Sequence, residues 1–218
     1  MTEKIKVFLV DDHPLVRDGL ANLINQEPGL VVCGEAGNEP EALALIATAK
    51  PAVAVVDISL EKGSGIELVK SLKAQHPEVV TLVLSMHDES LYAERSLHAG
   101  ARGYIMKREA AKKIVQGILA VHSGQLYVSE KISAQLAEKF VGGRKAAGGL
   151  VEQLSDRELE VFQLLGRGLN TRQIAEHLHV GFKTVQAYSA RIKEKLNLAN
   201  ATELLSEAIR WSDSQQKK

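Results

Sequence analysis

The sequence is poor in cysteine, in long apolar runs and in net charge. Cys33 is the only cysteine, which excludes an internal disulfide and a cysteine-based zinc cluster, and its apolar neighbours are typical of a small core residue. No apolar stretch is long enough to span a bilayer, and the N-terminus lacks the apolar segment of a signal peptide. We therefore expect no membrane association and a location in the reducing cytoplasm. Because the formal net charge is zero, any binding to nucleic acid must come from a local basic patch.

The first half of the chain alternates between short apolar runs and helical patterns. The apolar runs are rich in β-branched residues, which is typical of strands buried on both faces of a parallel sheet. Five strands are expected: Ile5–Val10, Leu30–Glu35, Ala52–Asp57, Val79–Ser85 and Gly103–Met106. Five helices are expected: Pro14–Gln26, Glu39–Ala49, Gly65–Gln75, Glu89–Ala99 and Ala110–His122. This order predicts an α/β domain with a doubly wound, five-stranded parallel sheet and helices on both of its faces.

The pattern changes after residue 122. The segment SEKISAQLAEKF predicts a short amphipathic helix capped by Ser129, and VGGRKAAGGL, with four glycines in ten residues, predicts a flexible linker. From Val151 onward every apolar pattern is helical. We therefore predict an α/β domain at 1–122, a linker with a short helix at 123–150, and an all-α domain at 151–218.

Polar residues stand at the ends of four of the five expected strands. Asp11 and Asp12 follow the first strand, Asp57 ends the third, Ser85 ends the fourth, and Lys107 follows the fifth. The carboxyl ends of parallel strands meet at one edge of the sheet, where open α/β folds bind ligands. We therefore expect three carboxylates, a hydroxyl and an ammonium group to converge there.

The adjacent acids have two interpretations when they are taken alone. Asp12 could cap the helix that begins near Pro14, or it could belong to a ligand site. The joint placement at four strand ends favours the ligand site. Three carboxylates in one place repel one another, and a divalent cation such as Mg²⁺ removes that repulsion. A carboxylate held beside the cation is able to act as a nucleophile toward phosphorus, with Lys107 neutralising charge on the phosphoryl oxygens.

Four segments carry a family resemblance: LVDDHPLVRDGL, VVDIS, LVLSMHDE and GARGYIMK. Together they resemble the receiver domain of two-component response regulators, and the resemblance covers the whole first domain. It implies that Asp57 accepts a phosphoryl group from a sensor histidine kinase. It also implies that Asp12 binds Mg²⁺ directly and that Asp11 assists. The backbone carbonyl of Ser59 would complete the protein ligands.

The same resemblance implies roles on the phosphoryl side of the site. Lys107 would contact the phosphoryl group, Ser85 would be the switch hydroxyl, and Tyr104 would change rotamer with it. One position departs from the family pattern, because Glu61 stands where receivers usually have a proline. The loop after Asp57 is then less pre-ordered, and the effect on phosphoryl lifetime stays open.

The last part of the chain shows the signals of a helix-turn-helix. Ser155 and Glu158 form a capping-box pattern at the start of one helix. Asn170 or Thr171 caps a second helix, and the short turn HVGF leads to a third helix at about Lys183–Leu196. Two helices joined by a tight turn that contains glycine are typical of this DNA-binding motif.

The third helix separates apolar from polar residues. Val185, Ile192 and Leu196 face inward, and Tyr188 does so in part. Between Phe182 and Lys195 there are four basic residues and one acidic residue, which gives a local net charge of +3. Such a patch suits phosphate binding, although an ordinary solvated helix face has the same composition.

The segment LSDRELEVFQLLGRGLNTRQIAEHLHVGFKTVQAYSARIKEKL resembles the LuxR-type helix-turn-helix of the NarL/FixJ response regulators. The resemblance implies contacts from Lys183 and Thr184 to backbone phosphate. Eight residues of the third helix are predicted to contact DNA: Lys183, Thr184, Gln186, Ala187, Tyr188, Ala190, Arg191 and Lys193. Glutamine pairs with adenine and alanine methyl groups meet thymine methyl groups, so Gln186 and Ala187 favour a half-site that contains A·T pairs.

The last helix, TELLSEAIRWS, has two interpretations. Its leucines either fill the core of the domain or, as the family implies, help to form the dimer that binds DNA.

The chain is thus identified as a phosphorylation-controlled DNA-binding regulator and not an enzyme, with Mg²⁺, a sensor histidine kinase and DNA as partners. Activation would release the recognition helix and favour a homodimer. Two alternatives remain. The receiver could be a dimerisation module that is independent of phosphorylation. The first domain could instead be a phosphoaspartate hydrolase, but Ser59 stands where such enzymes usually have a second aspartate.

Overall fold

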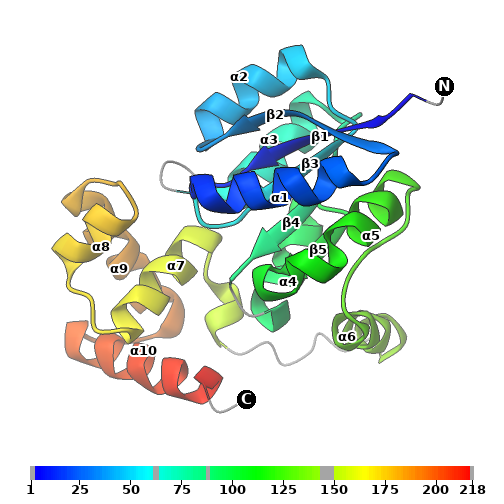
Figure 1. Ribbon diagram of the computed structural model, residues 1–218. Helices are drawn as coiled ribbons and strands as arrows, with labels where there is room; N and C mark the ends of the chain where they lie inside the picture. The colour runs from blue at the N-terminus through cyan, green and yellow to red at the C-terminus, as the bar shows by residue number, and fades with distance from the viewer. Residues whose placement is uncertain (1–2, 61–63, 87–88, 143–149, 217–218) are drawn as a thin grey trace. The chain divides into compact units, whose positions relative to one another are not determined.

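The computed structural model describes residues 3–60, 64–86, 89–142 and 150–216. The chain divides into two compact units, residues 1–141 and residues 142–218, and each is described by itself (Figure 1). Glu61 and most of the predicted linker VGGRKAAGGL lie outside the described residues. No helix among the described residues has the length and apolar character that crossing a membrane requires.

The first unit is built on a sheet of five parallel strands in the order β2-β1-β3-β4-β5. The strands are β1 (Ile5–Val10), β2 (Leu30–Ala36), β3 (Val53–Asp57), β4 (Val80–Ser85) and β5 (Gly103–Met106). Every residue of β3 and β5 is buried, because helices cover both faces of the sheet. The predicted doubly wound fold is therefore confirmed.

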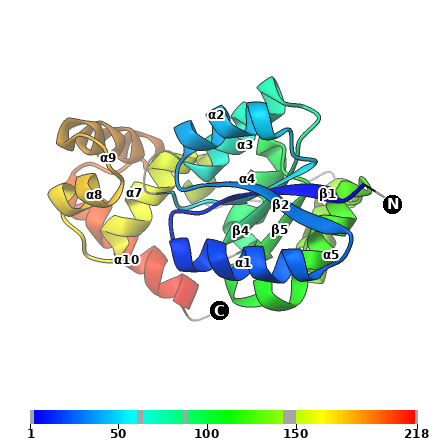
Figure 2. The same ribbon diagram turned by 45° about the horizontal axis from the view of Figure 1, so that its top comes forward.

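The helices of the first unit lie in two layers. α1 (Pro14–Gln26) and α5 (Ala110–His122) cover one face, and α2 (Glu39–Ala49), α3 (Gly65–Gln75) and α4 (Glu89–Ala99) cover the other (Figure 2). A single 3₁₀ turn, η1 (Lys107–Glu109), joins β5 to α5. This arrangement leaves the carboxyl ends of the strands at one rim, where the loops after β1, β3, β4 and β5 meet.

The segment after α5 returns to the edge of the sheet. The carbonyl of Tyr127 accepts a hydrogen bond from the backbone N–H of Tyr104 at 2.8 Å, and the N–H of Tyr127 donates to the carbonyl of Arg102 at 3.0 Å. Tyr127 thus extends the sheet beside β5 as an isolated parallel bridge.

The predicted short helix forms as α6 (Glu130–Gly142). Ser129 caps it by accepting a hydrogen bond from the N–H of Ile132 at 3.2 Å, as predicted. Ile132 is buried, and Lys139 pairs with Glu94 of α4. The helix is therefore packed on the first unit, which the amphipathic pattern alone could not show.

The second unit is all helical over its described residues. It contains a short 3₁₀ turn, η2 (Leu150–Gln153), followed by α7 (Asp156–Gly166), α8 (Thr171–His177), α9 (Phe182–Leu196) and α10 (Ala201–Gln216). The predicted capping box at Ser155 and Glu158 is confirmed, and Asn170 is the cap of α8. The core of the unit is formed by Leu159, Phe162, Ile174, Val185 and Ile192, each with no exposed surface.

Candidate functional site

The three aspartates come together at the carboxyl rim of the sheet. Asp11 and Asp57 are each only 2% exposed, and Asp12 is half-buried. One ligand atom from each of Asp11, Asp12, His13 and Asp57 lies within 4.8 Å of the others. The predicted convergence of carboxylates from the ends of β1 and β3 is thus present in the structure.

Asp12 does not cap α1. The N-cap position is His13, whose side chain makes no capping bond, so the capping interpretation of Asp12 is wrong. Asp11 instead fixes the start of the helix, because its Oδ1 accepts a hydrogen bond from the backbone N–H of His13 at 2.9 Å. Asp11 therefore serves both the start of α1 and the acid cluster, and Asp12 belongs to the cluster alone.

Lys107 lies between the two buried acids. Its Nζ is 2.7 Å from Oδ2 of Asp57, to which it donates a hydrogen bond, and 2.6 Å from Oδ2 of Asp11, a close ion pair. Burial alone would lower the pKa of Lys107, but the charges of Asp57 and Asp11 outweigh it and hold the pKa above its usual value. The ammonium group is therefore protonated and fixed next to Asp57.

Asp57 carries an unusual proton affinity for an aspartate. Burial raises its pKa from 3.8 to about 6. The charge and hydrogen bond of Lys107 and a backbone hydrogen bond at Ser59 oppose the rise, and the charge of Asp11 adds to it. Asp57 Oδ1 is buried and has no hydrogen-bond partner. A buried carboxylate oxygen without a partner is costly, so a cation at this place would relieve the cost.

The donor set fits Mg²⁺. Hard divalent cations prefer carboxylate, carbonyl and water oxygens, and Asp11, Asp12 and Asp57 supply the carboxylates within one small space. The predicted carbonyl ligand belongs to Ser59, an exposed residue two positions after Asp57. The buried partnerless oxygen of Asp57 is the feature of this structure that a metal ligand would explain.

Ser85 and Tyr104 lie on the neighbouring strands. Ser85 is completely buried at the end of β4, where Leu84 pairs with Asp57 in register. Tyr104, on β5, is 3% exposed and pairs in register with Val83 of β4. The two predicted switch residues are therefore on adjacent strands, and the strand of Ser85 lies beside the strand that carries Asp57.

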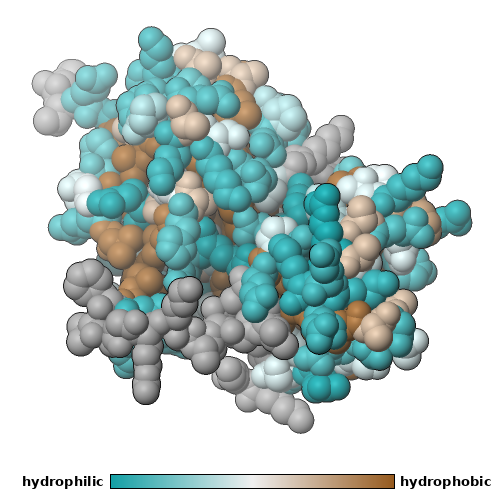
Figure 3. Space-filling view, turned by 180° about the vertical axis from the view of Figure 1, so that it is seen from behind, coloured by the Kyte–Doolittle hydropathy of each residue, from teal (hydrophilic) through white to brown (hydrophobic). Residues whose placement is uncertain are grey.

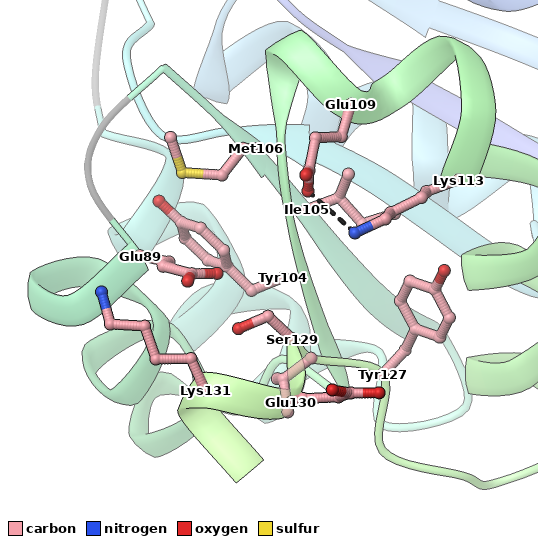
Figure 4. A pocket seen from close by; sticks show the side chains of 11 residues that line it. Glu89, Tyr104, Ile105, Met106, Glu109, Lys113, Tyr127, Ser129, Glu130 and Lys131 are labelled. Atoms are coloured by element: carbon pink, nitrogen blue, oxygen red, sulfur yellow. Dashed lines mark hydrogen bonds and ion pairs between the residues drawn. The ribbon is translucent and has the colours of Figure 1, made fainter. Parts of the chain in front are cut away.

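Tyr104 also lines a cavity of about 400 Å³ next to β5. Figure 4 shows its ring beside Glu89 of α4 and Met106 of β5, with Ser129 next to Tyr104 and the side chain of Lys131, from the first turn of α6, reaching toward Glu89. Tyr104, the side chain that is predicted to move, and the first turn of α6 therefore line the same cavity.

Gly65, at the start of α3, is a site residue that sequence reasoning missed. A Cβ atom at this position would lie 1.9 Å from the backbone carbonyl oxygen of Asp57. The backbone of α3 therefore approaches the backbone at Asp57 as closely as only glycine allows. The sequence offered one signal, the glycines of KGSGIEL at the end of the loop after Asp57, but glycine-rich loops have many causes.

The residues predicted to contact DNA lie on the exposed surface of α9. Lys183, Thr184, Gln186, Ala187 and Arg191 are exposed, as is Ala190, while Tyr188 and Lys193 are half-buried. Val185, Ile192 and Leu196 are buried, as predicted. The tight turn before α9 contains His179 in the left-handed region at φ 50° and ends with Gly181.

One cation of the predicted basic patch is already paired. Lys195 Nζ lies 2.6 Å from Oε2 of Glu158, a carboxylate only 3% exposed at the start of α7. Burial would raise the pKa of Glu158, but hydrogen bonds from Lys195 and Ser155 keep it below its usual value. The charge left for phosphate contacts on α9 is therefore smaller than the count of basic residues indicates.

A buried acidic rim with a fixed lysine at the end of a doubly wound sheet defines the class of phosphoacceptor receiver domains. The comparisons agree with this class. Residues 7–119 match the response regulator receiver domain, and residues 152–208 match the bacterial regulatory proteins of the luxR family. The chain therefore belongs to the response regulators that combine a receiver with a LuxR-type helix-turn-helix, the NarL/FixJ family, whose members are transcription regulators and not enzymes.

Similar proteins cover almost the full length of the chain. The DNA-binding transcriptional activator DevR/DosR of Mycobacterium tuberculosis is 35% identical over 91% of this chain and 91% of its own. The oxygen regulatory protein NreC of Staphylococcus epidermidis is 31% identical over 94% of this chain and 97% of its own. RcsB of Salmonella enterica serovar Typhimurium, solved bound to a promoter with a phosphomimetic, is 25% identical over 94% of this chain and 98% of that chain, with a TM-score of 0.64.

Proposed function

We propose that this protein is a cytoplasmic transcriptional regulator whose DNA binding is controlled by phosphorylation of Asp57 by a sensor histidine kinase. The observation that carries the proposal is the environment of Asp57: a buried carboxylate with one oxygen held by Lys107 and the other without a partner. That arrangement suits a nucleophile that is oriented but not saturated with hydrogen bonds.

The chain's own residues prepare the transfer. A carboxylate oxygen of Asp57 forms a bond to phosphorus, and the bond from phosphorus to the kinase imidazole breaks. The imidazole, which carries a proton on its other ring nitrogen, leaves as a neutral histidine. Lys107, already 2.7 Å from Asp57, stabilises the negative charge on the transferred group. Asp11, Asp12, Asp57 and the carbonyl of Ser59 would hold Mg²⁺, which supplies charge neutralisation for the phosphoryl oxygens when bound.

The new dianion then alters the neighbouring strands. Ser85 donates a hydrogen bond to a phosphoryl oxygen, and Tyr104 follows it, as in other switches that respond to a phosphoryl group. Tyr104 contacts β4 on one side and the cavity beside α6 on the other. A homodimer formed on activation would place two α9 helices in major grooves about one turn, ~34 Å, apart.

Mass spectrometry after treatment with acetyl phosphate and Mg²⁺ tests the phosphorylation step. We expect one added phosphoryl group on the wild-type chain and none on Asp57→Asn. Selection of DNA fragments with and without the phosphodonor then tests control: the wild type should gain selected sequences and Asp57→Asn should not. Equal labelling of both chains would place the acceptor elsewhere, and equal selection without phosphodonor would favour the alternative, a phosphorylation-independent dimerisation module.

The division of DNA contacts on α9 is tested by salt dependence. Lys183→Ala should reduce the slope of log affinity against log salt by about one unit, because one phosphate contact is lost. Gln186→Ala should keep the slope and relax sequence choice, because a base contact is lost. The reverse assignment of the two effects would contradict the proposed roles.

A further inference from the structure

Phe182, which the sequence analysis did not place among the DNA contacts, is the first residue of α9 and is 48% exposed. Among the residues that the structure describes, it is the only aromatic side chain in the group of strongly exposed large apolar residues. Its neighbours on α9 show the contrast, because Val185 and Ile192 have no exposed surface at all. Figure 3 shows mostly hydrophilic side chains over the face of the second unit that it draws.

The ring lies on the face of α9 that carries the predicted base contacts. Phe182, Gln186 and Ala190 are spaced four residues apart and are all exposed, so they form one stripe along the helix. Four residues of helix rise by about 6 Å, which is close to two base-pair steps of about 3.4 Å. A base contact from Phe182 would therefore fall one to two base pairs beyond the contact from Gln186.

The chemistry of the ring narrows its target. The side chain of Phe182 has no hydrogen-bonding group and no charge, so the ring cannot bind phosphate or the polar edge of a base. Thymine is the base that offers an apolar group, the C5-methyl, in the major groove. The N-terminal residues of a recognition helix are those that reach base edges in helix-turn-helix complexes.

We propose that Phe182 reads a thymine methyl group one to two base pairs beyond the base contacted by Gln186. The inference rests on the proposed function in one respect, namely that α9 enters the major groove. It adds a specificity determinant at the start of the helix, next to Lys183 and Thr184, whose predicted contacts are to phosphate.

Replacement of single thymines by deoxyuridine tests the proposal. A DNA fragment selected by the phosphodonor-treated full-length protein is resynthesised with one thymine at a time lacking its methyl group. Affinities are measured by fluorescence anisotropy for the wild type, Phe182→Ala and Phe182→Leu. At one position per half-site, we expect deoxyuridine to weaken wild-type binding about fourfold, the effect of one buried methyl group.

The two Phe182 variants test whether the phenyl ring is the group that contacts this thymine methyl. Phe182→Ala should bind the thymine fragment more weakly than the wild type and lose the deoxyuridine effect at that position, whereas Phe182→Leu should keep part of it. Leu45→Ala, which removes an exposed apolar side chain on α2, is the matched control and should leave the whole profile unchanged. Circular dichroism confirms that each variant is folded.

Three results would overturn the proposal. An unchanged deoxyuridine profile in Phe182→Ala would show that the ring reads no methyl group. Weaker binding by Phe182→Ala with the full deoxyuridine effect retained would reduce Phe182 to a sequence-independent contact. Failure of the wild type to select any DNA would instead contradict the proposed function itself, and the inference with it.

Discussion

Asp57 has a raised pKa, yet it can bind a cation only when its carboxylate is deprotonated, so protons and metal compete for it at low pH. Its pKa of about 6 means that the carboxylate is ionised near neutral pH but gains a proton within a range where most aspartates stay charged. Protonation removes the ligand that a cation needs, because metal ions bind the deprotonated carboxylate. The acid cluster is therefore sensitive to pH in a range that its amino-acid composition does not indicate.

We predict that the affinity of the wild-type chain for Mg²⁺ falls as pH decreases below 6. The pKa in the metal-free protein lies above the usual value, so the proton competes with the metal, and the loss approaches tenfold per pH unit well below 6. Isothermal titration calorimetry between pH 5 and pH 7.5 measures it. Asp57→Asn should show weaker binding with a flatter pH profile. An equally steep profile in that variant would assign the titration to another group.

Gly65 supports a prediction with an internal control. Gly65→Ala forces the start of α3 away from the carbonyl of Asp57, because the added Cβ would lie 1.9 Å from that oxygen. We expect a loss of about 2–3 kcal/mol in the free energy of unfolding, typical of overpacking, and slower labelling by acetyl phosphate. Gly19→Ala lies in α1 with open space around the new atom and should stabilise the protein by about 0.5–1 kcal/mol.

Urea unfolding and the initial rate of phosphorylation measure both variants. Equal behaviour of Gly65→Ala and Gly19→Ala would show that the loop adapts without cost.

The contrast between these two glycines also shows what the sequence leaves unpredicted at the level of single residues. The sequence predicts which carboxylates lie at strand ends, because apolar runs mark where each strand ends. The close approach of α3 to Asp57 depends on three-dimensional packing, which no local pattern indicates.

At the level of elements, the described residues of α6 include an ion pair and a buried side chain, which differ in strength. Lys139 and Glu94 are about one-third exposed, and ion pairs of this kind contribute about 0–1 kcal/mol. Ile132 is 3% exposed, and truncation of a buried isoleucine to alanine costs about 2–4 kcal/mol. The apolar contact therefore decides whether the helix stays on the first unit.

Hydrogen exchange over α6 tests this ranking. Ile132→Ala should raise the exchange rates of the α6 amides by tenfold or more, and Glu94→Gln should raise them by less than about fivefold. The amides of β3, the central strand of the sheet, should not change in either variant. A larger effect of Glu94→Gln than of Ile132→Ala would show that the ion pair, and not the buried side chain, holds α6.

The last helix shows why periodicity left two interpretations open. Leu204 and Ala208 are buried in the second unit, whereas Leu205 and Ile209, on the next positions around the helix, are 40% and 41% exposed. The helix therefore has a core face and a second apolar face. The sequence alone could not tell the buried face from the exposed one, because the two apolar stripes are adjacent on the helix. Which of them is buried depends on where α7 packs against α10.

At the scale of the whole molecule, the chain consists of two compact units with different chemistry. Ligands that bind the native state stabilise only the unit that they bind, by an amount that grows with the logarithm of their concentration. The acid cluster lies entirely in residues 1–141, and α9 lies entirely in residues 142–218. The sequence predicted the order of strands and helices in both units, because each element has a strong local pattern of apolar residues.

We predict that thermal unfolding of the full chain shows two transitions, of which Mg²⁺ raises only one. The shift should be about 2–3 kcal/mol in stability when Mg²⁺ is present at 100 times its dissociation constant. Asp12→Asn should reduce the shift, and an operator fragment should raise the other transition. Differential scanning calorimetry measures both. A single transition that responds to both ligands would show that the two units unfold together.

The bridge formed by Tyr127 has a consequence for how copies of this protein could associate. An edge strand with free N–H and C=O groups is a template on which another chain can add a strand. Tyr127 occupies that position along β5, because it bonds to both Arg102 and Tyr104. Two copies therefore cannot merge their sheets through β5 unless this residue first leaves, and a continuous intermolecular sheet would have to start from β2 at the opposite edge.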